Sequence, residues 1–231
     1  AVAWGYAKEA AKRGVEIHQL TEVQDFVVNR NQVTAVKTNR GSIECGCVVQ
    51  AVAGTSSLLM NKLKIRSPIQ TFPLQAMVSQ PFKPFLNPLV SSSALHCYVQ
   101  QTSRGEIVFG GGTDPYPLYN TRSTLDLKES LLAHAIEMFP FMANVKLMRQ
   151  WAGMTDMTPD YSPIMGQSPY DNYYLDAGWG TWGFKATPIC GKTMAELVAT
   201  GRTPDLIKPF ELSRFSRFQQ VNEMGATAAS H

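Results

Sequence analysis

The stretch YYLDAGWGTWGFKATPICGKTMAELVATG, residues 173–201, decides the fold class because it predicts a strand, a turn and a helix in direct succession. We expect the strand at 173–177, a glycine-rich turn at 178–184 and the helix at 186–200. Glycines in such a turn allow the backbone to approach a ligand closely. The unpaired N–H groups at the start of the following helix attract electron-rich oxygens. The segment therefore predicts an α/β unit with a turn that faces a ligand.

Lys185 lies at the start of the predicted helix, directly before residue 186, where the helix dipole disfavours a positive charge. A cation in that place indicates a task, such as pairing with an anionic ligand. The alternative interpretation is an ordinary glycine-rich turn followed by a solvated lysine. The local sequence leaves both interpretations open.

The segments before this unit fall into two groups. Residues 1–63 predict a further α/β piece, with a helix at 1–12, a strand at 15–20, a hairpin of 25–28 and 33–38, a strand at 43–53 and a helix at 55–63. Residues 69–157 predict antiparallel strands interrupted by prolines, a helix at 125–138 with a capping box of Ser123 and Asp126, and a strand at 145–157. This order predicts an α/β (α+β) fold whose two domains the chain visits alternately.

The composition is that of an ordinary folded protein. The 231 residues carry a net charge of +3, and the basic residues are scattered, so nothing predicts a nucleic-acid partner. No run is long and apolar enough to span a bilayer. No signal peptide is recognisable, and we expect a cytoplasmic protein without a membrane partner.

Four cysteines occur, and only Cys45 and Cys47 lie close together, as C-G-C on the predicted strand at 43–53. Alternate residues of a strand share a face, so a metal-binding pair is conceivable. No second Cys/His pair has ligand spacing. The favoured interpretation is no metal, and reduced, partly buried thiols at these positions and at Cys97 and Cys190.

Two further segments have features of a ligand site. VVQAVAG, residues 48–54, predicts a buried strand whose small residues allow a ligand or another backbone to pass closely, and a plain core strand is the alternative. WAGMTDMTPDYSPIMG, residues 151–166, predicts a strand and then a proline-rich loop. Asp160 in that loop is able to hydrogen-bond a cofactor hydroxyl, although an Asx-turn is the commoner role for such an aspartate.

In this order the three segments resemble the family of FAD-dependent amine oxidases that contains D-amino-acid oxidase, glycine oxidase and the sarcosine oxidases. In that family a strand similar to VVQAVAG closes onto the nucleotide-binding sheet. A loop similar to TPDYSPIMG precedes a turn similar to GWGTWGF, which packs on the flavin ring. The resemblance covers nearly the whole chain. It is greatest to the beta subunits of heterotetrameric sarcosine oxidases, in phrases such as GVEIHQLTEV and FPLQAMVSQPFKP.

The resemblance implies which residues meet the substrate and the cofactor. Lys185 ends the G-F-K motif and is implied to contact the substrate carboxylate, and Thr113 is placed near the substrate cavity by its position at a strand end. The implied FAD contacts are Val52, Ala53 and Gly54 near the adenosine half, and Gly178, Gly180, Thr181, Trp182, Gly183 and Phe184 near the flavin ring.

The resemblance also implies the domains and the reaction. Residues 1–60 and 160–225 would form the remainder of an FAD-binding domain, and residues 61–159 a substrate domain with an antiparallel or mixed sheet flanked by helices. The implied enzyme oxidises sarcosine to glycine, passes the one-carbon unit to tetrahydrofolate and produces hydrogen peroxide, together with other sarcosine oxidase subunits. The alternatives are a flavin-free fragment or remnant without catalysis, and a related dimethylglycine or proline dehydrogenase.

The sequence departs from the family pattern in its front part. It contains no G-x-G-x-x-G, the motif that holds the FAD pyrophosphate. The beta subunits also carry FMN on a histidine that lies upstream of the helix AVAWGYA, and none of His18, His96, His134 and His231 falls at that place. The chain begins inside this helix, without an initiator Met. We therefore expect an incomplete chain: a processed product, an expressed fragment or a truncated reading frame.

Overall fold

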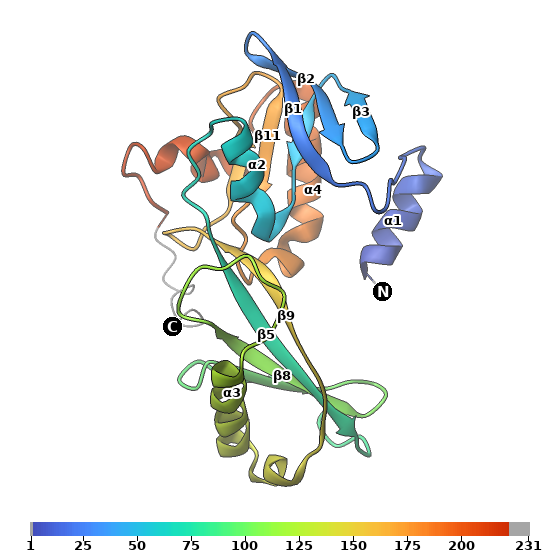
Figure 1. The fold of residues 1–231 in the computed structure, drawn as a ribbon, viewed down its shortest axis with the longest axis vertical. Helices are drawn as coiled ribbons and strands as arrows, with labels where there is room; N and C mark the ends of the chain where they lie inside the picture. The colour runs from blue at the N-terminus through green and yellow to red at the C-terminus, as the bar shows by residue number, and fades with distance from the viewer. Residues whose placement is uncertain (1, 222–231) are drawn as a thin grey trace.

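The computed structural model describes residues 2–221, and its strands form three sheets (Figure 1). Two small sheets lie at one end of the long axis, and one large sheet lies at the other. The chain crosses from the first end to the second along β5 (Gln70–Pro81) and returns along β9 (Leu147–Met157). We call residues 23–69 and 158–214 the mixed-sheet half, and residues 70–157 the antiparallel half.

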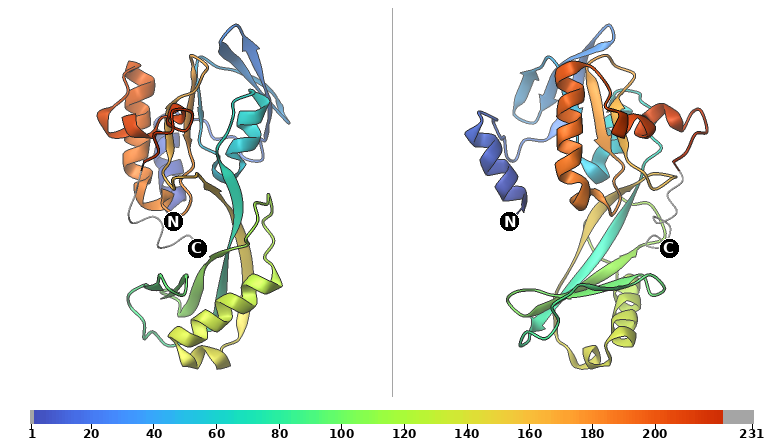
Figure 2. Two further views of the ribbon diagram at one scale, coloured as in Figure 1. Left: turned by 90° about the vertical axis from the view of Figure 1, so that its left-hand side faces the viewer. Right: turned by 180° about the vertical axis from the view of Figure 1, so that it is seen from behind.

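The antiparallel half is a five-stranded sheet in the order β6-β7-β8-β5-β9, with every neighbouring pair antiparallel. Its remaining elements are β6 (Val90–Ser92), β7 (Cys97–Gln101), β8 (Glu106–Thr113), α3 (Leu125–Met138) and the 3-10 helix η2 (Pro140–Asn144). Helix α3 covers one face of the sheet (Figure 2). Its buried Leu131 and Ala135 pack against Met77, Ile107 and Phe109, because residues four apart share a helix face. The apolar positions of this half therefore close a core of their own.

The mixed-sheet half contains two three-stranded sheets and two helices. Its elements are β1 (Val23–Asn29), β2 (Gln32–Thr38), β3 (Gly41–Glu44), β4 (Val48–Gln50), α2 (Ser56–Lys62), β10 (Ile164–Gln167), β11 (Tyr173–Ala177) and α4 (Gly183–Thr200), with 3-10 helices η1 (Ala53–Thr55), η3 (Asp205–Phe210) and η4 (Leu212–Arg214). Strand β11 is central in the order β10-β11-β4, antiparallel to β10 and parallel to β4. A parallel pair beside helices is the α/β arrangement expected from the sequence.

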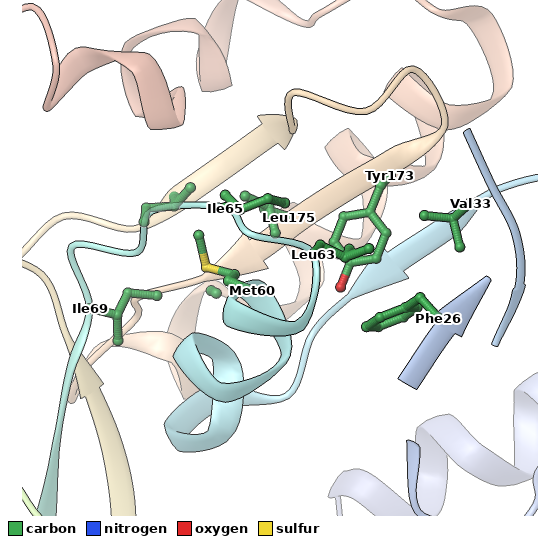
Figure 3. Packing of buried hydrophobic residues seen from close by; sticks show 10 residues of the cluster. Phe26, Val33, Met60, Leu63, Ile65, Ile69, Tyr173 and Leu175 are labelled. Carbon is green, nitrogen blue, oxygen red and sulfur yellow. The ribbon is translucent and has the colours of Figure 1, made fainter. Parts of the chain in front are cut away.

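Strand β11 buries both of its faces, since its residues alternate between two cores. Tyr173 and Leu175 point toward α2 and the β1–β2 hairpin, where the Phe26 ring meets the Tyr173 ring edge-on at 5.4 Å (Figure 3). Tyr174 packs on the other face, in the core formed with Met194 and its neighbours on α4. The glycine turn between β11 and α4 is therefore anchored at both ends by buried elements.

Several sequence predictions are confirmed. The helix at 125–138 and the strand at 173–177 have the expected bounds, and the hairpin and the antiparallel middle sheet are present. The first helix, α1 (Val2–Lys12), is also present, ends before the left-handed Gly14 and has no buried residue. Helix α4 begins at Gly183, earlier than the predicted residue 186. The domain boundaries stay a prediction, and residues 222–225 of the predicted range lie outside the described residues.

Other predictions of elements are wrong. Residues 15–20 form no strand, and Val15 and Ile17 are exposed there. The strand predicted at 43–53 is broken at Gly46, because the chain leaves one sheet for the other. The Asn172 side chain holds that break by donating to the Gly46 carbonyl at 2.9 Å. Cys45 and Cys47 therefore lie between strands and not on one, and both are free thiols.

Two local interpretations also need correction. The segment 48–54 is not a buried strand, since β4 ends at Gln50 and Val49 and Val52 are exposed among the described residues. Among residues 2–221, strand β4 pairs with β11 at one edge and with no strand at the other. The capping box before α3 does not form, because the Thr124 hydroxyl donates to Asp114 Oδ1 at 2.7 Å and the helix has no side-chain cap.

Candidate active site

A cavity of about 1170 Å³ lies between the two halves of the molecule. The glycine turn and the start of α4 line one side of it, and strands β5 and β9 with the β6–β7 connection line the other. The lining includes Ala51, Ala53, residues 74–76, residues 91–93, residues 96–98, Gly111, residues 153–156 and residues 179–184. A concave, mostly apolar site between two structural units is the usual place for a cofactor and a small substrate.

The glycine turn has a backbone that only glycine adopts easily. Gly178 and Gly180 have φ angles of 74° and 52°, in the left-handed region. A Cβ at Gly178 would lie 2.6 Å from Thr158 Cγ2, and one at Gly180 would lie 2.7 Å from Met157 Sδ. The turn therefore packs directly against the end of β9 and the loop that follows it. This is the loop of the TPDYSPIMG segment, which the sequence places before the glycine turn.

Two aspartates hold this turn, the buried Asp156 and the half-buried Asp176. The Gly178 N–H donates to Asp156 Oδ2 at 2.5 Å, and the Gly180 N–H donates to Asp156 Oδ1 at 3.3 Å and to the Asp156 carbonyl at 2.9 Å. The Trp179 indole donates to Asp176 Oδ1 at 2.6 Å. Burial raises the pKa of both aspartates above the ordinary value, although these hydrogen bonds oppose the shift.

The first turn of α4 faces the same cavity, and its first amides have no partner within the part of the chain that the structure describes. Trp182 is the N-cap, no described side chain caps the helix, and its first turn has no acidic residue. Gly183, Phe184 and Thr187 line the cavity. The helix dipole and the free N–H groups make this end attractive to an electron-rich or anionic group.

The structure brings together part of the predicted site. The cavity-lining members of the predicted set are Ala53, Gly180, Thr181, Trp182, Gly183 and Phe184. Gly178 lies behind the cavity wall on Asp156, and Val52, Gly54 and Thr113 lie outside the lining. Lys185 is exposed beside the cavity, with its Nζ 5.9 Å from the centre of the Trp182 ring. The cofactor and substrate roles of all these residues stay predictions.

Sequence reasoning missed other residues of the cavity. Asp156 and Asp176 belong to no motif that marks an acidic site, and only their position beside the turn, buried for Asp156 and half-buried for Asp176, identifies them. His96 has a φ of 45°, and its Nδ1 is buried without a hydrogen-bond partner among the described residues. Cys97 and Cys190 also line the cavity, and burial raises the pKa of both thiols to about 11, so they are neutral near pH 7.

Asp160, singled out in the sequence as able to bind a cofactor hydroxyl, has a structural role instead. Both of its carboxylate oxygens accept hydrogen bonds from the Arg214 guanidinium, at 2.8 and 3.0 Å. The Ser162 N–H also donates to Asp160, as in an Asx-turn. Among residues 2–221, no cluster of three or more possible metal ligands exists, and no helix has the length and apolar character needed to cross a membrane.

Comparisons with known proteins agree with this geometry. The family model described as FAD dependent oxidoreductase (DAO) matches residues 1–197. The sarcosine oxidase subunit beta of Rhodobacter capsulatus is 42% identical over 231 residues, which is 100% of this chain and 56% of that protein. The subunit beta of an Arthrobacter species is also 42% identical, over 100% of this chain and 57% of its own length.

Two solved structures have a similar fold. L-proline dehydrogenase from P. horikoshii superposes with a TM-score of 0.86 at 30% identity, over 94% of this chain and 59% of that one. Glycine oxidase from Geobacillus kaustophilus superposes with a TM-score of 0.81 at 22% identity, over 90% and 56%, and at that identity shows the fold alone. This chain spans little more than half the length of these relatives. The chain is thus homologous to sarcosine oxidase beta subunits and belongs to the family of FAD-dependent oxidoreductases of the DAO type.

Proposed function

We propose that this chain forms the part of a flavoenzyme that faces the flavin ring and the substrate, in an enzyme that oxidatively demethylates sarcosine to glycine. The observation that carries the proposal is the opening of the glycine turn and the uncapped start of α4 onto the cavity shared with the antiparallel sheet. The 42% identity to sarcosine oxidase beta subunits over the whole chain supports this choice of substrate.

FAD bound in the cavity would supply the two-electron oxidation of the substrate C–N bond. The first amides of α4 would hold the electron-rich edge of its ring, next to Gly180, Thr181 and Trp182. Ala53 would lie toward the adenosine half, with Val52 and Gly54 behind it. The described residues offer no glycine-rich loop that would bind the pyrophosphate of FAD. They would therefore contact only the flavin-ring end of the cofactor.

Lys185 would bind the substrate carboxylate from the edge of the cavity. The described residues give its ammonium group no ion-pair partner, and its contact with the Trp182 ring keeps it next to the cavity wall. Thr113 would complete the substrate side, because it pairs with the cavity-lining Leu74. A carboxylate bound by Lys185 would fix the position of the substrate methylamino group in the cavity.

We also propose partners from the relatives. Because the Rhodobacter and Arthrobacter proteins are named as subunits, this chain would assemble with other sarcosine oxidase subunits. The full reaction would then pass the one-carbon unit to tetrahydrofolate, and electrons through FMN to oxygen, producing hydrogen peroxide.

Titration with FAD tests the proposal directly. The purified chain is expected to take up FAD saturably, with a perturbed visible spectrum, and the loaded protein is expected to produce formaldehyde and glycine from sarcosine. Lys185→Ala is expected to raise KM for sarcosine by about tenfold or more, since a hydrogen bond to a charged group contributes about 1.5–3 kcal/mol. Lys192→Ala, an exposed lysine farther along α4, is the matched control. Equal KM values for the two variants would refute the role of Lys185.

Two alternatives give different results in the same experiment. A chain that stays colourless with excess FAD would be a flavin-free fragment without catalysis of its own. The 30% identity to L-proline dehydrogenase favours a second candidate, a dehydrogenase of proline or dimethylglycine. Steady-state assays of the loaded protein with sarcosine, proline and dimethylglycine separate these activities, and a higher kcat/KM for either competitor would replace sarcosine as the substrate.

A further inference from the structure

We propose that Asp156 is a positioning residue that holds the glycine turn in its flavin-binding shape. The proposal rests on the proposed function, because it assumes that the cavity receives a flavin. Asp156 lies near the end of β9 in the antiparallel half, and its side chain crosses to the turn of the mixed-sheet half. It therefore joins the two walls of the cavity at the point where they meet.

The Asp156 carboxylate has two acceptor oxygens, and the turn presents two backbone N–H groups to them. One Asp156 oxygen accepts the Gly178 N–H, and the other oxygen accepts the Gly180 N–H. The Gly180 N–H also meets the Asp156 backbone carbonyl. These two amides point toward β9, and the next residues, Thr181 to Gly183, line the cavity. Because glycines have the widest choice of backbone angles, an external partner is needed to select one shape.

The charge of Asp156 indicates a functional role beyond the fold. Asp156 is 2% exposed and has no ion-pair partner among the described residues, whereas the buried Asp160 is paired with Arg214. A buried charge without a counter-ion is costly, and a neutral side chain would close an ordinary turn at lower cost. An ionised carboxylate is nevertheless the side chain that accepts hydrogen bonds at both oxygens, which this pair of amides requires. We infer that the free-energy cost of burying the Asp156 charge is retained because the carboxylate fixes the backbone conformation of the glycine turn.

Asp156→Asn is the direct test, because it keeps the size of the side chain and replaces one acceptor with a donor that opposes a backbone N–H. Asp176→Asn is the comparison variant, since Asp176 is a half-buried cavity aspartate that accepts a hydrogen bond from the Trp179 side chain of the same turn. We expect Asp156→Asn to weaken FAD binding by about tenfold or more, from the penalty of an unsatisfied amide. We expect Asp176→Asn to weaken it less, with similar urea midpoints for both variants.

A second measurement uses no flavin. In ¹H–¹⁵N NMR spectra of the chain, the amide protons of Gly178 and Gly180 are expected far downfield, exchanging slowly with solvent. Asp156→Asn is expected to move both signals upfield and to speed their exchange, and Asp176→Asn is expected to leave them nearly unchanged. If the chain does not bind FAD but these signals behave as described, the proposed function fails while the positioning role of Asp156 stands.

Other outcomes would overturn the inference. FAD affinity of Asp156→Asn within about twofold of the wild type would show that the turn keeps its shape without the carboxylate. Equal losses of affinity in the two variants would assign the effect to general burial of charge. If neither Asp156→Asn nor Asp156→Ser folds, Asp156 is a residue of the fold and the specific role is wrong.

Discussion

The buried ion pair between Asp160 and Arg214 yields the largest predicted effect on stability. Both side chains are 2% exposed, and two hydrogen bonds join them, from Nε at 2.8 Å and from Nη2 at 3.0 Å. The same guanidinium donates to the carbonyls of Ser162 and Phe210. The pair thereby fixes the segment after α4 to the loop after β9, beneath the glycine turn.

Arg214→Ala removes the cation and leaves the carboxylate of Asp160 buried and unpaired. Removing one partner of a buried pair costs about 3–5 kcal/mol. Loss of this amount is a large part of the total of about 5–15 kcal/mol typical of native proteins. Arg214→Lys keeps the charge but loses the planar fork that binds both carboxylate oxygens, so an intermediate loss is expected.

Urea unfolding followed by tryptophan fluorescence measures these differences. Arg217→Ala is the control, because Arg217 pairs with Glu211 nearby on the surface, where the side chains are 50% and 49% exposed. Such exposed pairs contribute about 0–1 kcal/mol. If Arg214→Ala loses no more than 1 kcal/mol beyond Arg217→Ala, on the order of the surface-pair contribution itself, the reasoning on this pair is wrong.

The pair also predicts an acid transition. Burial alone would raise the pKa of Asp160, but the hydrogen bonds from Arg214 and the backbone outweigh it and hold the pKa below the ordinary value. The folded state therefore favours the ionised form, and this contribution to stability is full above the ordinary aspartate pKa of about 3.9. It is lost as the pH falls from there through the lowered folded value. A wild-type chain whose acid unfolding curve matches that of Arg214→Ala would contradict this.

Three further predictions concern single sites. Burial raises the pKa of Asp156 above its value in the unfolded chain, so proton binding to this group stabilises the folded state relative to the unfolded one. Its contribution to stability should fall as the pH rises through that raised value and the carboxylate ionises, and this fall should be absent from urea unfolding of Asp156→Asn across the same pH series. Gly111→Ala should cost about 1–3 kcal/mol or more, because φ is 147° and a Cβ would clash with the His96 carbonyl; an unchanged thermal unfolding midpoint would contradict this. Leu131→Ala, at a side chain 1% exposed in the core under α3, should cost about 2–5 kcal/mol in urea unfolding. Leu125→Ala, at 62% exposure on the same helix, should change stability by less than about 0.5 kcal/mol, and similar losses in both would refute the packing of α3.

Elements with a strong local pattern were predictable from the sequence. The strand at 173–177 and the helix at 125–138 have the expected bounds because their apolar periodicity and flanking residues agree. The prediction failed at 15–20 and at 43–53, where β-branched residues suggested strands. A strand needs a partner, and a propensity scale contains no information on whether a partner lies beside it. At Gly46 the chain instead passes from one sheet to another.

The sequence by itself determined the family, the glycine turn and the helix that starts beside it, because these depend on residue types in a fixed order along the chain. Tertiary structure alone decided which groups surround the turn. Asp156 and Gly178 are 22 residues apart, and Asp160 and Arg214 are 54 residues apart. The first aspartate holds the turn, and the second is neutralised by an arginine. These different roles follow from burial and from long-range partners, which the spacing of residues along the chain does not contain.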